Sequence, residues 1–181
     1  MTELESGVDP DTLRMTVASR DAARVRVTQL RADLLWAPDE TAELLTRGEL
    51  VDLLGAAGEY DQALSESQQA VDRAEMVGTG AQQHLARIRL AQAHQWRAEF
   101  AASNLEFADL VRAANRYGPV IAGFTHHQAG VNAYDQGDYD AAERHFGNAL
   151  ALRQEFELTD QVAHSRAALA AVARRVRDAA P

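Results

Sequence analysis

The chain has 181 residues, a net charge of −9 and no cysteine. That charge disfavours general attraction to nucleic acid or to an anionic membrane. The lack of cysteine excludes disulfides, a thiolate metal site and a cysteine nucleophile. No apolar run approaches the roughly 20 residues of a membrane span, and the first residues lack the charged-then-apolar pattern of a secretory signal. We therefore expect a cytoplasmic protein with no nucleic-acid or membrane partner.

The predicted elements are helices separated by short turns. Residues 1–10 are polar and acidic and have no period, so we predict a disordered N-terminal tail. Beyond them, apolar residues recur at helical spacing, and proline or glycine interrupts the pattern at intervals. The fold class is therefore predicted to be all-α, with about eight helices over residues 11–36, 38–56, 60–76, 81–97, 100–116, 119–136, 139–156 and 160–178.

The turns reveal a repeat. Gly58, Ala98 and Gly137 occupy equivalent places, 40 and 39 residues apart. At matching distances after each turn come a small residue, then a core residue, then another core residue. The three sets are Ala63, Ser103 and Ala142; Ser67, Phe107 and Phe146; and Ala70, Leu110 and Ala149. We expect these positions to be buried between the two helices of each unit.

One stretch of the repeat resembles the tetratricopeptide repeat (TPR) family. The residues that carry the resemblance are 130–134 (GVNAY), 137–142 (GDYDAA), Phe146 and Ala149–Leu150. The units are longer than the usual length of about 34 residues, and in this they are similar to bacterial regulatory and sensor TPR proteins. The resemblance implies a right-handed α-solenoid of antiparallel helix pairs in a single domain over 11–181. Its parts are a half-unit at 11–36, units at 39–77, 80–117 and 119–157, and a capping helix at 159–178.

Such a stack implies a concave groove lined by the first helix of each unit. The residues expected in this ligand-binding groove are Arg89, Gln92, Trp96, Phe124, His127, Gln128, Val131 and Tyr134. Trp96 and Tyr134 are the candidate anchors, because aromatic residues carry much of the binding energy at interfaces. The alternative for both is that they simply pack against the next unit.

Catalytic and metal-binding patterns are not evident in the sequence. His126 and His127 are adjacent, so they point to different sides of a helix, whereas His145 lies on the partner helix, from which it can approach His126. Paired acids such as Asp138 and Asp140 sit at helix starts, where the helix dipole favours negative charge. We therefore predict no catalytic residues, no metal and no cofactor.

The predicted function is a non-catalytic scaffold that holds a protein or peptide ligand in its groove. Two alternatives stay open. The chain could form a homo-oligomer by stacking through its terminal helices, or it could be the small-peptide sensor module of a larger regulator. An enzyme is the less favoured possibility. Helical repeats can also host active sites, and a closed polar pocket would be the marker of an enzyme.

Overall fold

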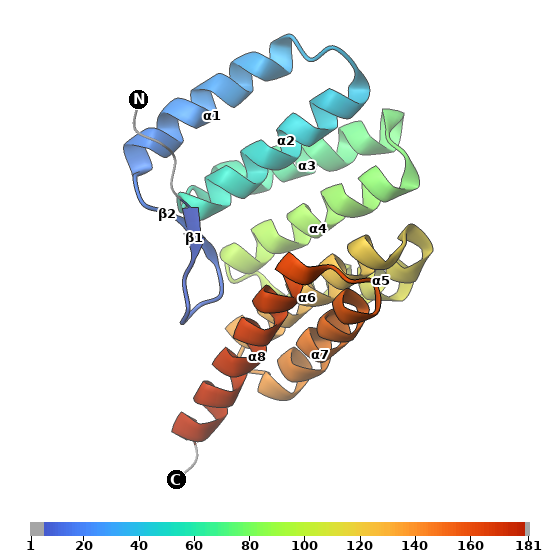
Figure 1. Ribbon diagram of the computed structural model, residues 1–181. Coiled ribbons are helices and arrows are strands. Elements are labelled where there is room, and N and C mark those ends of the chain that lie inside the picture. Colours follow the sequence, from blue (N-terminus) through green and yellow to red (C-terminus); the bar gives the residue numbers. More distant parts are fainter. Residues whose placement is uncertain (1–5, 180–181) are drawn as a thin grey trace. The chain divides into compact units, whose positions relative to one another are not determined.

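The computed structural model describes residues 6–179, except for the side chain of Asp160. It confirms the all-α class (Figure 1). The helices are α1 (Arg20–Leu35), α2 (Glu40–Ala56), α3 (Tyr60–Val77), α4 (Gly80–Trp96), α5 (Phe100–Ala113), α6 (Pro119–Asp135), α7 (Tyr139–Glu155) and α8 (Thr159–Ala179). A short 3-10 helix, η1 (Ala114–Tyr117), follows α5. Within the described residues, no helix is long and apolar enough to cross a membrane.

The chain forms two compact units. Unit 1 comprises Met1–Asp9 and Arg14–Glu99, and unit 2 comprises Pro10–Leu13 and Phe100–Pro181. The sequence predicts a single domain over 11–181, whereas the contacts in the structure divide the chain into these two units. The boundary falls between α4 and α5, so the two helices predicted to pair over 80–117 belong to different units. We expected them to pair because the sequence repeat runs through this turn without interruption.

The N-terminal prediction also needs correction. Ser6–Val8 (β1) is not disordered: it pairs antiparallel with Met15–Val17 (β2), with Val8 opposite Met15. Helix α1 consequently begins at Arg20 and not near residue 11. Ser19 fixes that start, because its side chain accepts a hydrogen bond from the backbone N–H of Ala22. Residues 1–5 of the predicted tail lie outside the described residues.

The predicted burial pattern is confirmed at all three repeats. Ala63, Ser103 and Ala142 are completely buried, and the six positions that follow them in the repeat are at most 3% exposed. In unit 1 the apolar core consists of a cluster around Leu30, Leu50 and Leu54 and a second cluster around Ala74 and Leu90. In unit 2 the core includes Val131, Tyr134, Phe146, Ala168 and Val172.

The same type of hydrogen-bonded turn ends four helices, α2, α4, α6 and α7. Its left-handed residue is Gly58 (φ 80°), Ala98 (φ 59°), Gly137 (φ 76°) or Glu157 (φ 55°). In each turn the N–H of this residue bonds the carbonyl three residues back, and the next N–H bonds the carbonyl five residues back, as Gly58 N–H to Gly55 and Glu59 N–H to Leu54 do. These are Schellman motifs, which satisfy the last carbonyls of a helix. The three equivalent turns in the sequence repeat therefore share one backbone geometry.

Ala98 is the residue in this set whose replacement tests the geometry best. A Cβ atom makes the left-handed conformation unfavourable, so Ala98→Gly should raise the free energy of unfolding by about 0.5–1 kcal/mol. Gly137→Ala should lower it by about 1 kcal/mol for the same reason. Urea unfolding of the two variants measures both effects. If the two substitutions shifted stability in the same direction, the shared turn geometry would be wrong.

Candidate functional site

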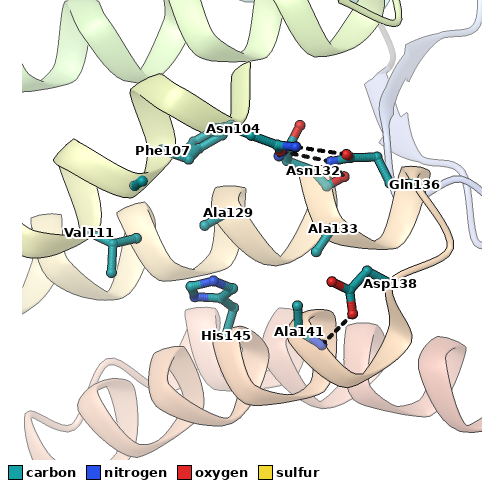
Figure 2. A pocket seen from close by; sticks show the side chains of 11 residues that line it. Asn104, Phe107, Val111, Ala129, Asn132, Ala133, Gln136, Asp138, Ala141 and His145 are labelled. Carbon is teal, nitrogen blue, oxygen red and sulfur yellow. Dashed lines mark hydrogen bonds between the residues drawn. The ribbon is translucent and has the colours of Figure 1, made fainter. Parts of the chain in front are cut away.

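A pocket of about 270 Å³ opens among α5, α6 and α7 of unit 2 (Figure 2). Its wall on α5 includes the aromatic ring of Phe107 and the side chain of Val111, one turn apart. Alanines at 129, 133 and 141 face it from α6 and α7, and their small side chains leave the space open. The complete lining is Asn104, Phe107, Ala108 and Val111 from α5; Ala129, Asn132, Ala133 and Gln136 from α6 and its end; and Asp138, Ala141 and His145 from the start of α7 and α7 itself.

Three carboxamides meet at one end of the pocket, where Figure 2 shows them pointing toward one another. Asn104 and Gln136 bond reciprocally: Asn104 Nδ2 donates to Gln136 Oε1 at 2.9 Å, and Gln136 Nε2 donates to Asn104 Oδ1 at 2.9 Å. The buried Asn132 adds a bond from its Nδ2 to Asn104 Oδ1 at 2.6 Å. Ser103, completely buried behind it, donates to Asn132 Oδ1 at 2.8 Å. The cluster is therefore held from the core outward.

These bonds leave hydrogen-bonding capacity at the exposed edge of the cluster. A carboxamide offers two N–H donors and two acceptor sites on its oxygen. Within the described residues, Asn104 uses one N–H and both acceptor sites, so one N–H stays unused. Gln136 uses both N–H groups, on Asn104 and on the Asn132 carbonyl, but only one acceptor site. One donor and one acceptor thus remain side by side on exposed residues.

At the other side of the pocket, the ionisable groups have structural partners. The Asp138 side chain accepts a hydrogen bond from the N–H of Ala141 and so caps α7. His145 Nδ1 lies 3.2 Å from His126 Nδ1, which confirms that His145 approaches His126 from the partner helix. Burial, together with the other imidazole, lowers the pKa of His126. Burial and Arg144 lower the pKa of His145. Both imidazoles therefore take up a proton less readily than a histidine in water.

The eight predicted groove residues are divided between the two units, and none lines this pocket. In unit 1, the Arg89 guanidinium lies against Gly48 and bonds both carboxylate oxygens of Asp52, at 2.9 to 3.2 Å. The Trp96 indole lies over Gly55, where a Cβ would clash with it, and stacks on Tyr60 at 6.4 Å. Gln92 is partly buried on the same helix.

In unit 2, the structure places the other five residues on α6. Val131 and Tyr134 are only 5% and 6% exposed and belong to the core, which is the packing alternative that the sequence left open for Tyr134. The ring of His127 lies 5.3 Å from that of Phe146, and its Nδ1 lies 3.4 Å from Nη1 of the buried Arg153. Phe124 and Gln128 are partly buried.

Sequence reasoning missed the carboxamide cluster. A usable signal existed: Asn132 and Gln136 are four residues apart and so share a helix face, and Asn104 interrupts a helix otherwise rich in better helix formers. The sequence alone gave no sign that α5 would bring Asn104 to that face. Within residues 6–179, no group of three or more His, Cys, Asp or Glu side chains is arranged to hold a metal ion.

Comparison with known proteins gives a likeness of fold alone. No family model matches the chain, and no curated protein matches it. Among solved structures, the chain is similar to the crystal structure of BtubC (BKLC) from P. vanneervenii, with a TM-score of 0.67 and 19% sequence identity. The match covers 87% of this chain and 67% of that one. This likeness supports the all-α class.

Proposed function

We propose that this protein is a non-catalytic binding scaffold of the TPR type that takes an extended segment of another protein. Two features support the TPR assignment. The helix–turn–helix repeat keeps a spacing of 40 and 39 residues, and each repeat has the same turn and the same buried positions. Repeats of this kind present their surfaces to partner chains. We also propose a bacterial, cytoplasmic protein, because the chain has no cysteine and resembles bacterial regulatory proteins.

The observation that carries the proposal is the free edge of the Asn104–Gln136 pair. An extended peptide presents N–H and C=O groups that need partners when they leave water. The unused N–H of Asn104 and the unused acceptor site of Gln136 match the C=O and N–H of one residue of an extended segment, which point to the same side of the chain. Val111, which is partly buried on α5, offers apolar surface to one side chain of that peptide, while the ring of Phe107 one turn away is only 3% exposed. Main-chain bonds would give affinity, and the apolar wall would select the side chain.

A matched pair of asparagine variants tests this site. Peptides selected from a displayed random library on the immobilised protein should bind Asn104→Ala at least tenfold more weakly, a loss of about 1.4 kcal/mol. Asn148→Ala, an exposed asparagine on α7, should change the affinity less than twofold. Isothermal titration provides both values. Undiminished binding to Asn104→Ala would place the ligand elsewhere, and a library that yields no binders would count against a peptide scaffold.

A further inference from the structure

The loop Pro10–Leu13, which closes the N-terminal hairpin, belongs to unit 2 and docks on α8. Arg174 Nη2 donates to the Pro10 carbonyl at 3.1 Å, and Arg175 Nη2 donates to the Asp11 carbonyl at 3.1 Å. Both acceptors are main-chain oxygens, which every residue type presents. The loop is thus held partly by its backbone, as a bound peptide is, and the negative charge of Asp11 also attracts Arg175.

Leu13 anchors the loop by its side chain. It has a φ of 58°, in the left-handed region that favours glycine or asparagine, and hairpin loops often need such a residue just before the second strand. A leucine there carries backbone strain. Its side chain packs against the unit 2 core cluster that contains Tyr134 and Val172. The strain is therefore offset by a contact that glycine could not make.

Tyr134 fixes the arginine that receives the loop. Arg175 Nε donates to the Tyr134 hydroxyl at 3.1 Å, while Nη2 of the same guanidinium reaches Asp11. Tyr134 is itself immobilised: it is 6% exposed, and its ring lies 5.6 Å from that of Tyr139. The donor is consequently oriented by the core and is in place before a peptide arrives, which lowers the entropy lost on binding.

We propose that the face of unit 2 formed by Tyr134, Arg174 and Arg175 is a second peptide-binding site, occupied in this chain by its own residues 10–13. Its partner is a protein segment that presents two consecutive main-chain carbonyls and, two residues further on, an aliphatic side chain. The face shares no residue with the α5–α7 pocket, so the inference goes beyond the function proposed above. Because the tethered loop has a high effective concentration, an outside segment binds well only when the loop is released.

The test uses the full-length chain and a fluorescein-labelled peptide of residues 8–16 (VDPDTLRMT). Leu13→Asp removes the anchor but keeps a residue that tolerates the left-handed conformation. Fluorescence anisotropy should show the peptide binding Leu13→Asp at least tenfold more tightly than the wild type. Adding Arg175→Ala to that variant should weaken the peptide at least tenfold, whereas adding Arg177→Ala, on the same helix, should change its affinity less than twofold.

A second anchor variant and one control make the result decisive. Leu13→Gly keeps the turn and removes the side chain, so it should bind the labelled peptide as tightly as Leu13→Asp does. Agreement between the two variants shows that the gain comes from losing the anchor and not from the new residue. Adding Asn104→Ala to Leu13→Asp should not change the affinity for the labelled peptide, which separates this face from the α5–α7 pocket. Equal binding to wild type and both Leu13 variants, or no binding to either variant, would overturn the proposal.

Discussion

Phe146→Ala should lower the free energy of unfolding by about 3–5 kcal/mol, the usual cost of removing a large aromatic side chain from a packed core. Phe146 is completely buried on α7 and belongs to the core cluster of unit 2. Its ring lies directly against Gly130 of α6: a Cβ placed on that glycine would come within 2.6 Å of the ring. The two helices already approach closely at this point, so they cannot move further together to fill the cavity that the ring would leave.

Phe156→Ala is the matched control, because the same substitution is made at the C-terminal end of the same helix, where the ring is 48% exposed. It should cost no more than about 1 kcal/mol. Urea unfolding followed by circular dichroism gives both values. Gly130→Ala should also destabilise the protein, by about 1–3 kcal/mol, since its methyl group overpacks the same contact. A Phe146→Ala protein as stable as Phe156→Ala would contradict the packing of α6 on α7.

Stability should fall steeply as the pH drops below neutrality, and His127 should account for a large part of the fall. Burial, with Arg153 and His164 nearby, lowers the pKa of His127 from 6.5 to about 3. Above pH 6.5 the imidazole is neutral in both the folded and unfolded states, so its lowered pKa does not change the free energy of unfolding. Below pH 6.5 the imidazole binds a proton in the unfolded chain but not in the folded protein. Each pH unit then costs about 1.4 kcal/mol, or about 2 kcal/mol between pH 6.5 and 5.

His127→Gln should flatten this part of the profile, because glutamine stays neutral and can still accept a bond from Arg153. Asn148→Ala, at an exposed site on α7, removes no titratable group and serves as the control, so it should leave the slope unchanged. Between pH 6.5 and 5, the strongly paired carboxylate of Glu43 does not contribute to the slope. Burial raises the pKa of Glu43, but hydrogen bonds from Arg73 and Arg47 lower it below its usual 4.5, so Glu43 stays ionised. Equal slopes for His127→Gln and wild type between pH 6.5 and 5 would contradict the lowered pKa of His127 in the folded protein.

The repeat could be predicted from the sequence because it depends on residues that are close together in the chain. A Schellman turn needs one residue that accepts positive φ, and the glycines Gly58 and Gly137 identify two of these turns directly. The positions that follow each turn are buried at helical spacing. The same spacing predicts the left-handed turn at Ala98 and the buried position of Ser103, although neither residue is typical of its position. These features depend on contacts within one helix pair, so the pattern of a single stretch is enough to locate them.

The candidate sites depend on contacts that no local pattern contains. Helix α6 is buried on several faces, with Ala129, Asn132 and Val131 all nearly inaccessible, so its sequence does not indicate which face meets a ligand. The family resemblance directed attention to Val131 and Tyr134, whereas the pocket opens on the face of Ala129 and Asn132. The hairpin was missed for a related reason: strands of three residues have too short a pattern to be recognised before their pairing is known.

The most direct test of the scaffold proposal is to follow the side-chain NH₂ signals of Asn104 and Gln136 by NMR while a selected peptide is added to the full-length protein. The free edge of this carboxamide pair predicts that both signals shift saturably, with the midpoint at the Kd from titration, while the signal of Asn148 stays in place. Shifts that leave Asn104 and Gln136 unmoved at saturation would contradict the proposal that this pocket is where the protein receives its partner.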